Sequence, residues 1–541
     1  MFSDYQPNRF GLGRSAVISQ SGAVATSQPL AAHVGLQILQ SGGNAIDAAV
    51  ATAAMLNVVE PMSTGIGGDA FMLIYRPEDG EILGLNASGR APYAAEQAFF
   101  IDQGLSHIPD YHSMYAVTVP GAVDGWAMLL EKCGTMTMAD VLKPAIFYAE
   151  NGFPVSPQIS ASWQASVPLL SYCSDTLQTY LIDARAPKPG EIFKNVNLAR
   201  TLRLIGEGGR DAFYRGQIAE KIVKFSTENG GLFAMKDFIN HTSDWVEPIS
   251  VNYRGYDICE IPPNGQGIAA LMALNVVSEF DISAMGHNST ESLHCLIESM
   301  KLSFSDLYEY ITDPTFENVP VDGLLSTEYA KAQKNRIDPD QAMPNPSAGN
   351  PRMGDDTIYL SVVDKDRNVV SFINSLFHGF GSGLVAGDTG ILLQNRGAGF
   401  SLDSSHANCI DSHKRTMHTI IPGMIAQDGV PLVTFGVMGG QMQPQGHLQL
   451  VSNLIDFNMD VQSALDAPRF RVMDDGNISL ERGIPDGISN RLREKKHRIV
   501  PPNWYSPPTF FGGGQAIFVH PEYKTLIAGS DPRRDGCAVG Y

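Results

Sequence analysis

A proline- and glycine-rich stretch that ends at a hydroxyl residue and a β-strand constrains this sequence more than any other feature. Residues 338–354 are rich in proline and glycine, which discourage helix and strand alike. Directly after Thr357, alternating residues and a Val-Val pair predict a strand, which the polar turn 364–368 ends. Residues 369–372 begin a second strand, so we expect a β-hairpin. Thr357 therefore stands where a linker meets a buried strand.

This position gives Thr357 a chemical option. If the chain is cut between Asp356 and Thr357, one residue carries both a hydroxyl nucleophile and a free α-amine that can activate it. An α-amine has a reference pKa of about 7.7–8.0, so a useful fraction is neutral near physiological pH. Threonine is also an ordinary residue at the start of a strand. The residues alone leave both interpretations open.

Composition describes an ordinary globular protein and excludes one class of function. The chain has 541 residues, enough for a large core and two to four domains, with 43% hydrophobic and 18% charged residues. A formal net charge of −19 argues against nucleic-acid binding, because phosphates call for a basic surface. It says little about the substrate, since a basic pocket can lie inside an acidic shell.

Cysteine spacing limits which cofactors are expected, and the N-terminal residues indicate the cellular location. The six cysteines show neither CxxC nor Cys/His ligand spacing, so we predict no disulfide framework, no metal site and no cofactor. Residues 1–9 lack the basic start and apolar core of a signal peptide, and no run approaches the length of a membrane span. We expect a cytoplasmic protein without nucleic-acid or membrane partners.

The first half of the chain is predicted to be mainly helical. Residues 23–41 carry small and apolar residues at helical spacing, and Asn44 is a predicted N-cap for a second helix at 45–58. The glycine-rich turn 63–69 follows that helix and precedes a strand. Phosphate-binding loops need strand, glycines and then helix, so we predict no nucleotide site. From residue 136 to about 311 the periodicity is again mostly helical.

Two further features complete the expected organisation. The helix from Thr290 carries Glu298, Lys301 and Asp306, which we interpret as a solvated face or a buried charge pair rather than as catalytic groups. The C-terminal part is richer in strands. We expect strands at 432–436, 516–519 and 526–528, and helices at 451–457 and 461–465.

Several motifs carry a resemblance to a known family. They are Gly42 to Ala49, Gly65-Ile66-Gly67-Gly68, Thr357, Ser361-Val362-Val363-Asp364, Phe380-Gly381-Ser382-Gly383 and Gly390-Ile391-Leu392-Leu393. Together they resemble the γ-glutamyltranspeptidase family of N-terminal-nucleophile (Ntn) hydrolases, which cleave themselves in front of a Thr. The resemblance implies an α/β (α+β) fold, a four-layer αββα sandwich. Two interwoven segments would build it: a large-subunit segment, 1–356, and a small-subunit segment, 357–541.

The same resemblance implies a set of catalytic residues. Thr357 would be the nucleophile, its α-amine the base, and the Asp356–Thr357 bond the cleavage site. Gly439 and Gly440 match the family's oxyanion-binding pair, because side-chain-free residues let backbone N–H groups approach the oxyanion closely; a plain turn is the alternative. Ser375 stands where the family has a Thr that contacts the nucleophile's amine.

Positions that bind the γ-glutamyl group in the family differ here. Ser88 takes the place of the substrate-binding Arg, and Arg90 lies two residues further on. Gly399 replaces an acidic residue, and Phe377 replaces an Asn. A Ser-Ser pair is replaced by His418-Thr419. Such a site should bind an α-amino acid head group poorly, because each lost charged hydrogen bond costs about 1.5–3 kcal/mol.

The residues that remain favour an acidic small-molecule amide. Arg90, Arg396, His378, His418 and Thr419 are the candidate substrate-binding residues, although each is also common as a structural residue. Residues 438–447 resemble the family's amidohydrolase branch, which includes oxamate amidohydrolase. We therefore expect a self-processing amidohydrolase that acts through an acyl-enzyme on a small, carboxylate-bearing amide.

Two other functions stay open. One is a γ-glutamyltransferase or glutathione hydrolase that binds its substrate with other residues. The other is a non-catalytic homologue that remains one chain and serves as a binding protein. Denaturing electrophoresis separates the latter, since processing gives two fragments. The sequence leaves open the identity of the amide, hydrolysis against transfer, and assembly into a homo-oligomer.

Overall fold

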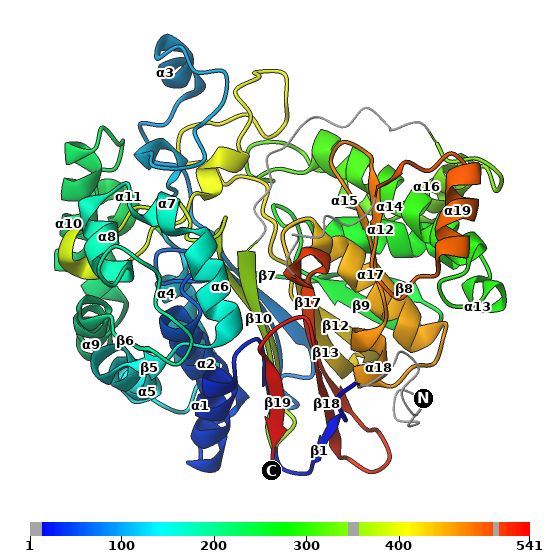
Figure 1. Cartoon of the computed structure of the whole chain (residues 1–541), viewed down its shortest axis with the longest axis horizontal. Helices are drawn as coiled ribbons and strands as arrows, with labels where there is room; N and C mark the ends of the chain where they lie inside the picture. Colours follow the sequence, from blue (N-terminus) through cyan, green and yellow to red (C-terminus); the bar gives the residue numbers. More distant parts are fainter. Residues whose placement is uncertain (1–12, 344–355, 501–507) are drawn as a thin grey trace.

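Two facing β-sheets, each covered by helices on its outer side, form the molecule (Figure 1). The structure is a computed structural model that describes residues 13–343, 356–500 and 508–541. Most of the predicted linker, residues 344–355, therefore lies outside the described residues. Three buried apolar clusters fill the three interfaces between layers. The predicted four-layer αββα sandwich is confirmed.

The first sheet holds the strand that begins at the predicted cleavage site. Its strand order is β19-β2-β10-β11-β3-β4-β7, and all neighbours are antiparallel. The strands are β19 (Cys537–Gly540), β2 (Ala23–Thr26), β10 (Asp356–Val363), β11 (Val369–Phe377), β3 (Asp69–Tyr75), β4 (Ile82–Ala87) and β7 (Asp244–Val246). The predicted hairpin after Thr357 is β10–β11.

The second sheet faces it across the molecule's centre. Its strand order is β1-β18-β17-β13-β12-β9-β8. The strands are β1 (Val17–Ser19), β18 (Leu526–Ser530), β17 (Gly513–Val519), β13 (Val430–Met438), β12 (Gly423–Gln427), β9 (Tyr256–Glu260) and β8 (Ile249–Tyr253). Each sheet combines strands from before and after Thr357. A cut at that residue would therefore leave two chains held together by shared sheets.

Helices cover the outer face of each sheet, on the left and right of Figure 1. The first layer contains α1 (Pro29–Gln40), α2 (Ala45–Val59), α4 (Ala122–Cys133), α5 (Met138–Asn151) and α9 (Val196–Tyr214). The second contains α12 (Gly267–Ser278), α14 (Thr290–Tyr310), α17 (Met442–Ile455) and α18 (Val461–Asp466). Asn44 caps α2 through a capping box, as predicted. Buried on all sides, α2 is Ala-rich because it lies between the sheet and other helices.

The other elements of the described ranges are shorter or peripheral. They are α3 (Gln97–Asp102), η1 (Met114–Ala116), α6 (Pro157–Ala165), α7 (Val167–Leu170), α8 (Ser174–Tyr180), α10 (Gln217–Glu228), α11 (Met235–Ile239), α13 (Ile282–Met285), α15 (Val321–Leu324), α16 (Thr327–Lys334), η2 (Gly387–Thr389), η3 (Arg396–Gly399), α19 (Asp486–Glu494), η4 (Pro508–Phe511), β5 (Phe153–Pro154), β6 (Ile192–Phe193), β14 (Phe470–Val472), β15 (Ile478–Leu480) and β16 (Ile499–Val500). In the part of the chain that the structure describes, no helix is both long and apolar enough to cross a bilayer.

Strand alternation decides where Thr357 points. Ile358 and Leu360 belong to the core under the first helix layer, whereas Tyr359 and Val363 belong to the core between the sheets. Successive side chains of a strand point to opposite faces. Thr357 has the parity of Tyr359, so its side chain belongs to the space between the two sheets.

One prediction of secondary structure was wrong. Residues 23–26, predicted as helix, form the inner strand β2, because the small apolar residues of a strand buried on both faces also fit a helical pattern. The region 136–311 is mostly helical, as predicted, and also contains the short strands β5 to β9. Of the two interpretations of the charged residues on α14, a solvated face or a buried charge pair, the structure shows the pair: Lys301 Nζ lies 2.7 Å from Glu298 Oε1, and both are buried.

Candidate active site

Thr357 lies at the start of β10, opposite an irregularity in its partner strand. Asp356 pairs with Phe377 and Ile358 with Asn374, so two residues, Ser375 and Leu376, oppose Thr357. Such a β-bulge re-aims the side chains around it. The buried Thr357 hydroxyl donates a hydrogen bond to Ser375 Oγ over 3.2 Å. The structure therefore brings together two of the predicted catalytic residues.

Ser375 connects the candidate nucleophile to a buried arginine. Its Oγ accepts from the backbone N–H of Phe377 at 2.9 Å and from Arg396 Nη2 at 3.4 Å. A second donor of the same guanidinium, Nη1, lies 2.7 Å from Thr419 Oγ1. Arg396 and Thr419 were both predicted as substrate-binding residues. Arg396 is one hydrogen bond from Ser375, the partner of Thr357, and Thr419 is two.

Arg396 carries a buried charge with few protein partners. Its side chain is fully buried, and its Nε has no hydrogen-bond partner within the described ranges. Nor does any described carboxylate form an ion pair with it; both described side-chain partners are hydroxyls. The ring of Phe377 covers one face of the guanidinium, with Arg396 Cζ 4.4 Å from the ring centroid. Burial lowers the pKa of Arg396 to about 9, and the charge of Asp69 only partly offsets this.

Asp69 organises the loops around this arginine. It pairs with Ser375 across β3 and β11, and it is fully buried. Its carboxylate accepts four hydrogen bonds, from Gly89 N (3.0 Å), Gly121 N (3.1 Å), Gln394 Nε2 (3.0 Å) and His418 Nε2 (3.1 Å). Burial by itself would raise the pKa of Asp69, but the His418 hydrogen bond and the Arg396 charge hold it below its ordinary value.

His418 supports Asp69, and the protein engages both of its ring nitrogens. Nε2 donates to Asp69, while Nδ1 accepts from Ile420 N over 3.4 Å. Burial, and next the positive charge of Arg396, lower the pKa of His418 to about 4. The imidazole is therefore neutral near pH 7, and this favours a structural role over direct contact with a substrate.

Gly439 and Gly440 form a fixed turn between β13 and α17. Both have positive φ, 124° and 58°, which glycine adopts readily. The Gly439 carbonyl accepts from Met442 N at 2.9 Å, and the Gly440 carbonyl from Gln443 N at 3.1 Å and Gln266 Nε2 at 3.0 Å. Carbonyl and N–H point in opposite directions across a trans peptide. The Gly440 N–H consequently points away from the start of α17.

The facing of the two sheets sets the register between β10, which begins at the candidate nucleophile, and β13, which leads into this turn. Ser361 Oγ contacts Thr434, and the ring of Tyr359 lies against Gly436, where a Cβ would be 2.5 Å from it. Moving back along β10 therefore corresponds to moving forward along β13. The next step in that register sets Thr357 against Met438, whose chain continues into Gly439-Gly440.

The other two predicted substrate-binding residues lie differently. Arg90 is half-buried and ion-paired: its Nη1 is 2.9 Å from Asp313 Oδ2 and 3.3 Å from the His413 carbonyl. The structure does not bring it to Thr357. His378 is half-buried beside the site, where it stacks on Phe377 with ring centroids 4.5 Å apart.

The positions that differ from the family pattern are filled by the protein itself. Ser88 is buried, and its hydroxyl donates to Asn86 Oδ1 over 2.7 Å. A Cβ on Gly399 would lie 3.3 Å from Thr416 Oγ1 and 4.0 Å from the ring of Phe377. A longer acidic side chain there would meet that ring. The left-handed backbone of Phe377, with φ 83°, is uncommon for an aromatic residue and holds the ring in this place.

Sequence reasoning missed several residues that build the site. Asp69 lies at the end of the predicted turn 63–69, and neither Asn264 nor Gln266 is among the predicted site residues. Asn264 Nδ2 donates to Ser88 Oγ and to the Thr416 carbonyl, while Gln266 Nε2 donates to the carbonyls of Thr419 and Gly440. The signal that could have pointed to these residues is their position in short polar turns rich in glycine, proline and side-chain amides. In the described ranges, no group of three or more His, Cys, Asp or Glu side chains could hold a metal ion.

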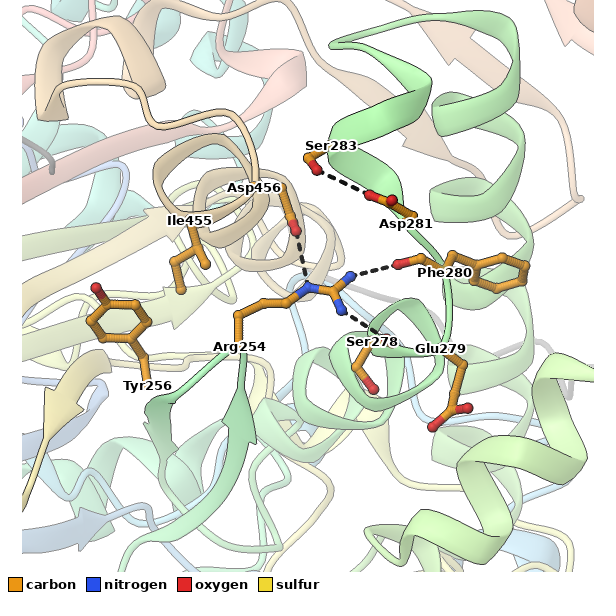
Figure 2. A pocket seen from close by; sticks show the side chains of 9 residues that line it. All are labelled: Arg254, Tyr256, Ser278, Glu279, Phe280, Asp281, Ser283, Ile455 and Asp456. Atoms are coloured by element: carbon orange, nitrogen blue, oxygen red, sulfur yellow. Dashed lines mark hydrogen bonds and ion pairs between the residues drawn. The ribbon is translucent and has the colours of Figure 1, made fainter.

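A large surface pocket lies elsewhere and does not compete with this site. Its volume is about 570 Å³, and it surrounds the turn between β8 and β9 (Figure 2). Arg254, at its centre, is already paired with Asp456 and donates to the carbonyls of Ser278 and Phe280. The other end of β9 leads to Asn264 and the Thr357 region, so this pocket is at the opposite end of the strand.

Comparisons with known proteins agree with the fold. The sequence profile of the family Gamma-glutamyltranspeptidase matches residues 31–541. The chain is 39% identical over 530 residues to the "Glutathione hydrolase-like YwrD proenzyme" of Bacillus subtilis (strain 168), covering 97% of this chain and 99% of that protein. It is 32% identical over 537 residues to the "Oxamate amidohydrolase proenzyme" of Klebsiella pneumoniae subsp. pneumoniae, covering 97% and 100%. The solved structure of cephalosporin acylase from Bacillus halodurans matches with a TM-score of 0.93 and 42% identity, covering 100% of this chain and 99% of that one.

Fold and relatives together define the class, an Ntn hydrolase that cleaves amide bonds. The chain belongs to the γ-glutamyltranspeptidase family. It is accordingly a proenzyme that processes itself into a large and a small subunit.

Proposed function

We propose that the processed protein hydrolyses a small amide whose acyl group carries a carboxylate, with Thr357 as the nucleophile. The observation that carries this proposal is Arg396, a buried guanidinium without a carboxylate partner among the described residues, one hydrogen bond from Ser375. A buried charge is costly unless it is paired. A substrate carboxylate would supply the missing partner.

Processing would cut the chain between Asp356 and Thr357 into pieces of 356 and 185 residues. Thr357 Oγ attacks the Asp356 carbonyl, and the resulting ester is hydrolysed, which frees the α-amine of Thr357. Residues 1–356 then form the large subunit and residues 357–541 the small one. The mixed strand origin of both sheets supports a product that stays assembled.

Turnover would use the same hydroxyl. The α-amine of Thr357 accepts the Oγ proton while Oγ attacks the substrate carbonyl. Backbone N–H groups at Gly439 and Gly440 stabilise the oxyanion. The C–N bond breaks, the amine leaves with the proton, and water hydrolyses the acyl ester. Ser375, which already binds the Thr357 hydroxyl, keeps the nucleophile in position.

The short path from Thr357 to Arg396 favours a short acyl group. Only Ser375 separates the candidate nucleophile from the guanidinium. A carboxylate directly next to the reactive carbonyl, as in oxamate, suits that spacing, and a planar guanidinium binds a carboxylate in bidentate fashion. Arg90 is the weaker candidate for this role, because Asp313 already neutralises it.

A γ-glutamyl substrate is the alternative that the names of several relatives, which are glutathione hydrolases, keep open. Ser88 and Phe377 argue against it. The first is hydrogen-bonded inside the protein, and the second fills the space next to Gly399.

An activity screen of the processed protein tests the proposal. Oxamate and other short acidic amides are compared with a γ-glutamyl anilide, with Thr357→Ala as the control for background hydrolysis. We expect turnover of short acidic amides and little of the anilide. Efficient release of the γ-glutamyl group, with transfer to a dipeptide, would contradict the proposal.

A further inference from the structure

The strands β12 and β13 separate just before the turn Gly439-Gly440, the candidate oxyanion turn. β12 pairs with β13 as far as Gly423 and Phe435. An antiparallel ladder continued by two residues would pair Ile421 with Val437. Instead, the N–H of each of these two residues donates to a side chain of α17. The sheet therefore opens between these strands where the chain approaches the oxyanion turn.

Two side chains of α17, one helical turn apart, fill this opening. Gln443 Oε1 accepts from Ile421 N at 2.9 Å, and His447 Nε2 accepts from Val437 N at 3.2 Å. Both side chains are fully buried, and residues i and i+4 lie on the same face of a helix. A Cβ on Gly423 would be 3.1 Å from His447 Cε1, so the ring lies directly against the end of β12. Gln443 and His447 thus form a wedge between two chain segments.

Glu260, at the end of β9, sets the orientation of the His447 ring. Its Oε1 lies 2.6 Å from His447 Nδ1, and both side chains are fully buried. Because Nε2 accepts a backbone N–H, the ring proton is on Nδ1 and is donated to Glu260. The other oxygen, Oε2, has no hydrogen-bond partner within residues 13–343, 356–500 and 508–541. The carboxyl thus fixes the tautomer in which His447 Nε2 is an acceptor.

The two segments that the wedge separates lead to the two halves of the candidate active site. On one side, the chain before Ile421 contains Thr419, whose hydroxyl accepts from Arg396. On the other side, β13 leads into the oxyanion turn. Gln266 Nε2 bridges the same gap, because it donates to the Thr419 carbonyl and, at 3.0 Å, to the second carbonyl of the turn. The wedge therefore sets the distance between the Arg396 site and the oxyanion turn.

We propose that His447 is a positioning residue, which fixes the oxyanion turn relative to Arg396 through the N–H of Val437. This inference rests on the proposed function, which assigns the oxyanion to the turn and the acyl carboxylate to Arg396. The role requires an acceptor at the position of His447 Nε2, and Glu260 provides it by binding the Nδ1 proton. A displaced turn would still let the substrate bind but would stabilise the transition state less.

Two amides that replace different parts of the imidazole test the inference. In His447→Gln, the amide oxygen reaches the position of Nε2 and can accept from Val437 N. In His447→Asn, the shorter amide reaches only the position of Nδ1 and contacts Glu260. Glu260→Gln keeps the acceptor for Nδ1–H, and a neutral group suits this position because burial raises the pKa of Glu260. Gln449→Ala is the matched control, since it removes a buried α17 amide that binds the backbone of Phe470 instead.

The kcat and KM of each variant are measured per processed molecule, with oxamate and with a γ-glutamyl anilide. Intact mass follows self-cleavage, and denaturant unfolding gives the stability. We expect His447→Asn to lower kcat about 10- to 100-fold with little change in KM, because a displacement of about 1 Å can cost this much. His447→Gln and Glu260→Gln should stay near the wild-type kcat. Gln449→Ala should lower the stability and leave kcat unchanged.

Equal kcat values in His447→Gln and His447→Asn would overturn the inference, because the effect would then not follow the acceptor for the Val437 N–H. A loss confined to KM, a comparable loss of kcat in Gln449→Ala, or failure of both His447 variants to self-cleave would do the same. Self-cleavage in the Gln variant alone would support it.

The proposed function is judged separately, by the substrate that the wild type turns over. If the wild type hydrolyses the anilide and not oxamate, the proposed substrate class is wrong. The variants are then compared on the anilide, since an oxyanion forms from any amide carbonyl.

Discussion

Two buried arginine sites in this molecule are built in opposite ways. Arg533 is bound by Glu481 at 2.6 Å and by Asp531 at 3.0 Å, and Arg469 shares Asp531 at 2.7 Å. That network is neutralised by the protein's own carboxylates, and the charges of Arg469 and Arg533 outweigh burial to lower the pKa of Asp531 to about 2. Arg396, equally buried, has hydroxyls as its described side-chain partners.

This difference in carboxylate partners distinguishes a charge that stabilises the fold from a charge that can bind a ligand. A closed network is complete in the free protein, so removing one member leaves an uncompensated buried charge. A guanidinium without a carboxylate partner gains its partner only when a substrate binds. Burial alone does not distinguish the two sites. They differ in whether a described carboxylate is paired with the arginine.

The largest effect is expected from substitutions of Thr357, the candidate nucleophile of the Arg396 site. Thr357→Ala is expected to remain a single chain and to lose turnover completely, because it lacks the hydroxyl that both reactions use. Thr357→Ser should still cleave, more slowly. Intact mass spectrometry checks both variants. Cleavage in the Ala variant, or a cut at another bond, would contradict the assignment of Thr357.

A substitution in the network of Arg469, Arg533 and Asp531 should lower the free energy of unfolding. Asp531→Asn removes the carboxylate that Arg469 and Arg533 share, and we expect it to destabilise the protein by about 3–5 kcal/mol. Arg396→Gln removes a charge that has no described carboxylate partner, so its stability should change by about 1 kcal/mol or less. Denaturant unfolding measures both. Equal destabilisation by the two variants would show that the contrast between the sites is not real.

How far the sequence predicts this arrangement depends on the range of the interaction. The hairpin after Thr357, the capped helix α2 and the buried Glu298–Lys301 pair follow local patterns and were predicted. The strand β2 was not, because Ala-Val-Ala fits a helix and a doubly buried strand equally.

The partners of the site residues were beyond prediction. Arg90 and Arg396 look alike in the sequence, yet Asp313, 223 positions away, neutralises the first. Asp69 gathers donors from residues between 89 and 418, so its role appears only when the chain is folded. Such contacts depend on tertiary packing, for which neither spacing nor composition carries a signal.

Low pH should lower the stability of the folded protein through protonation of His418. The pKa of His418 is lowered to about 4 in the folded protein, chiefly by burial and then by Arg396, from about 6.5 when exposed. Between these values the unfolded chain binds a proton that the folded one does not. The stabilisation is therefore fully present above about pH 6.5 and is lost as the pH falls toward 4.

A variant isolates this contribution. His418→Gln keeps an N–H donor for Asp69 but has no group that titrates in this range. We expect its melting temperature to depend less on pH between 6.5 and 4 than that of the wild type, as differential scanning calorimetry would show. Parallel profiles for the two proteins would refute the assignment.

The central claim is that Arg396 is reserved for a substrate carboxylate, and a charge cycle tests it most directly. The kcat/KM of the processed enzyme is measured with oxamate and with oxamide, its uncharged counterpart, for the wild type, Arg396→Gln and Arg90→Gln. We predict that the wild type prefers oxamate, that Arg396→Gln reduces this preference about 10- to 150-fold, and that Arg90→Gln leaves it unchanged. A preference that survives in Arg396→Gln, or disappears in Arg90→Gln, would contradict the claim.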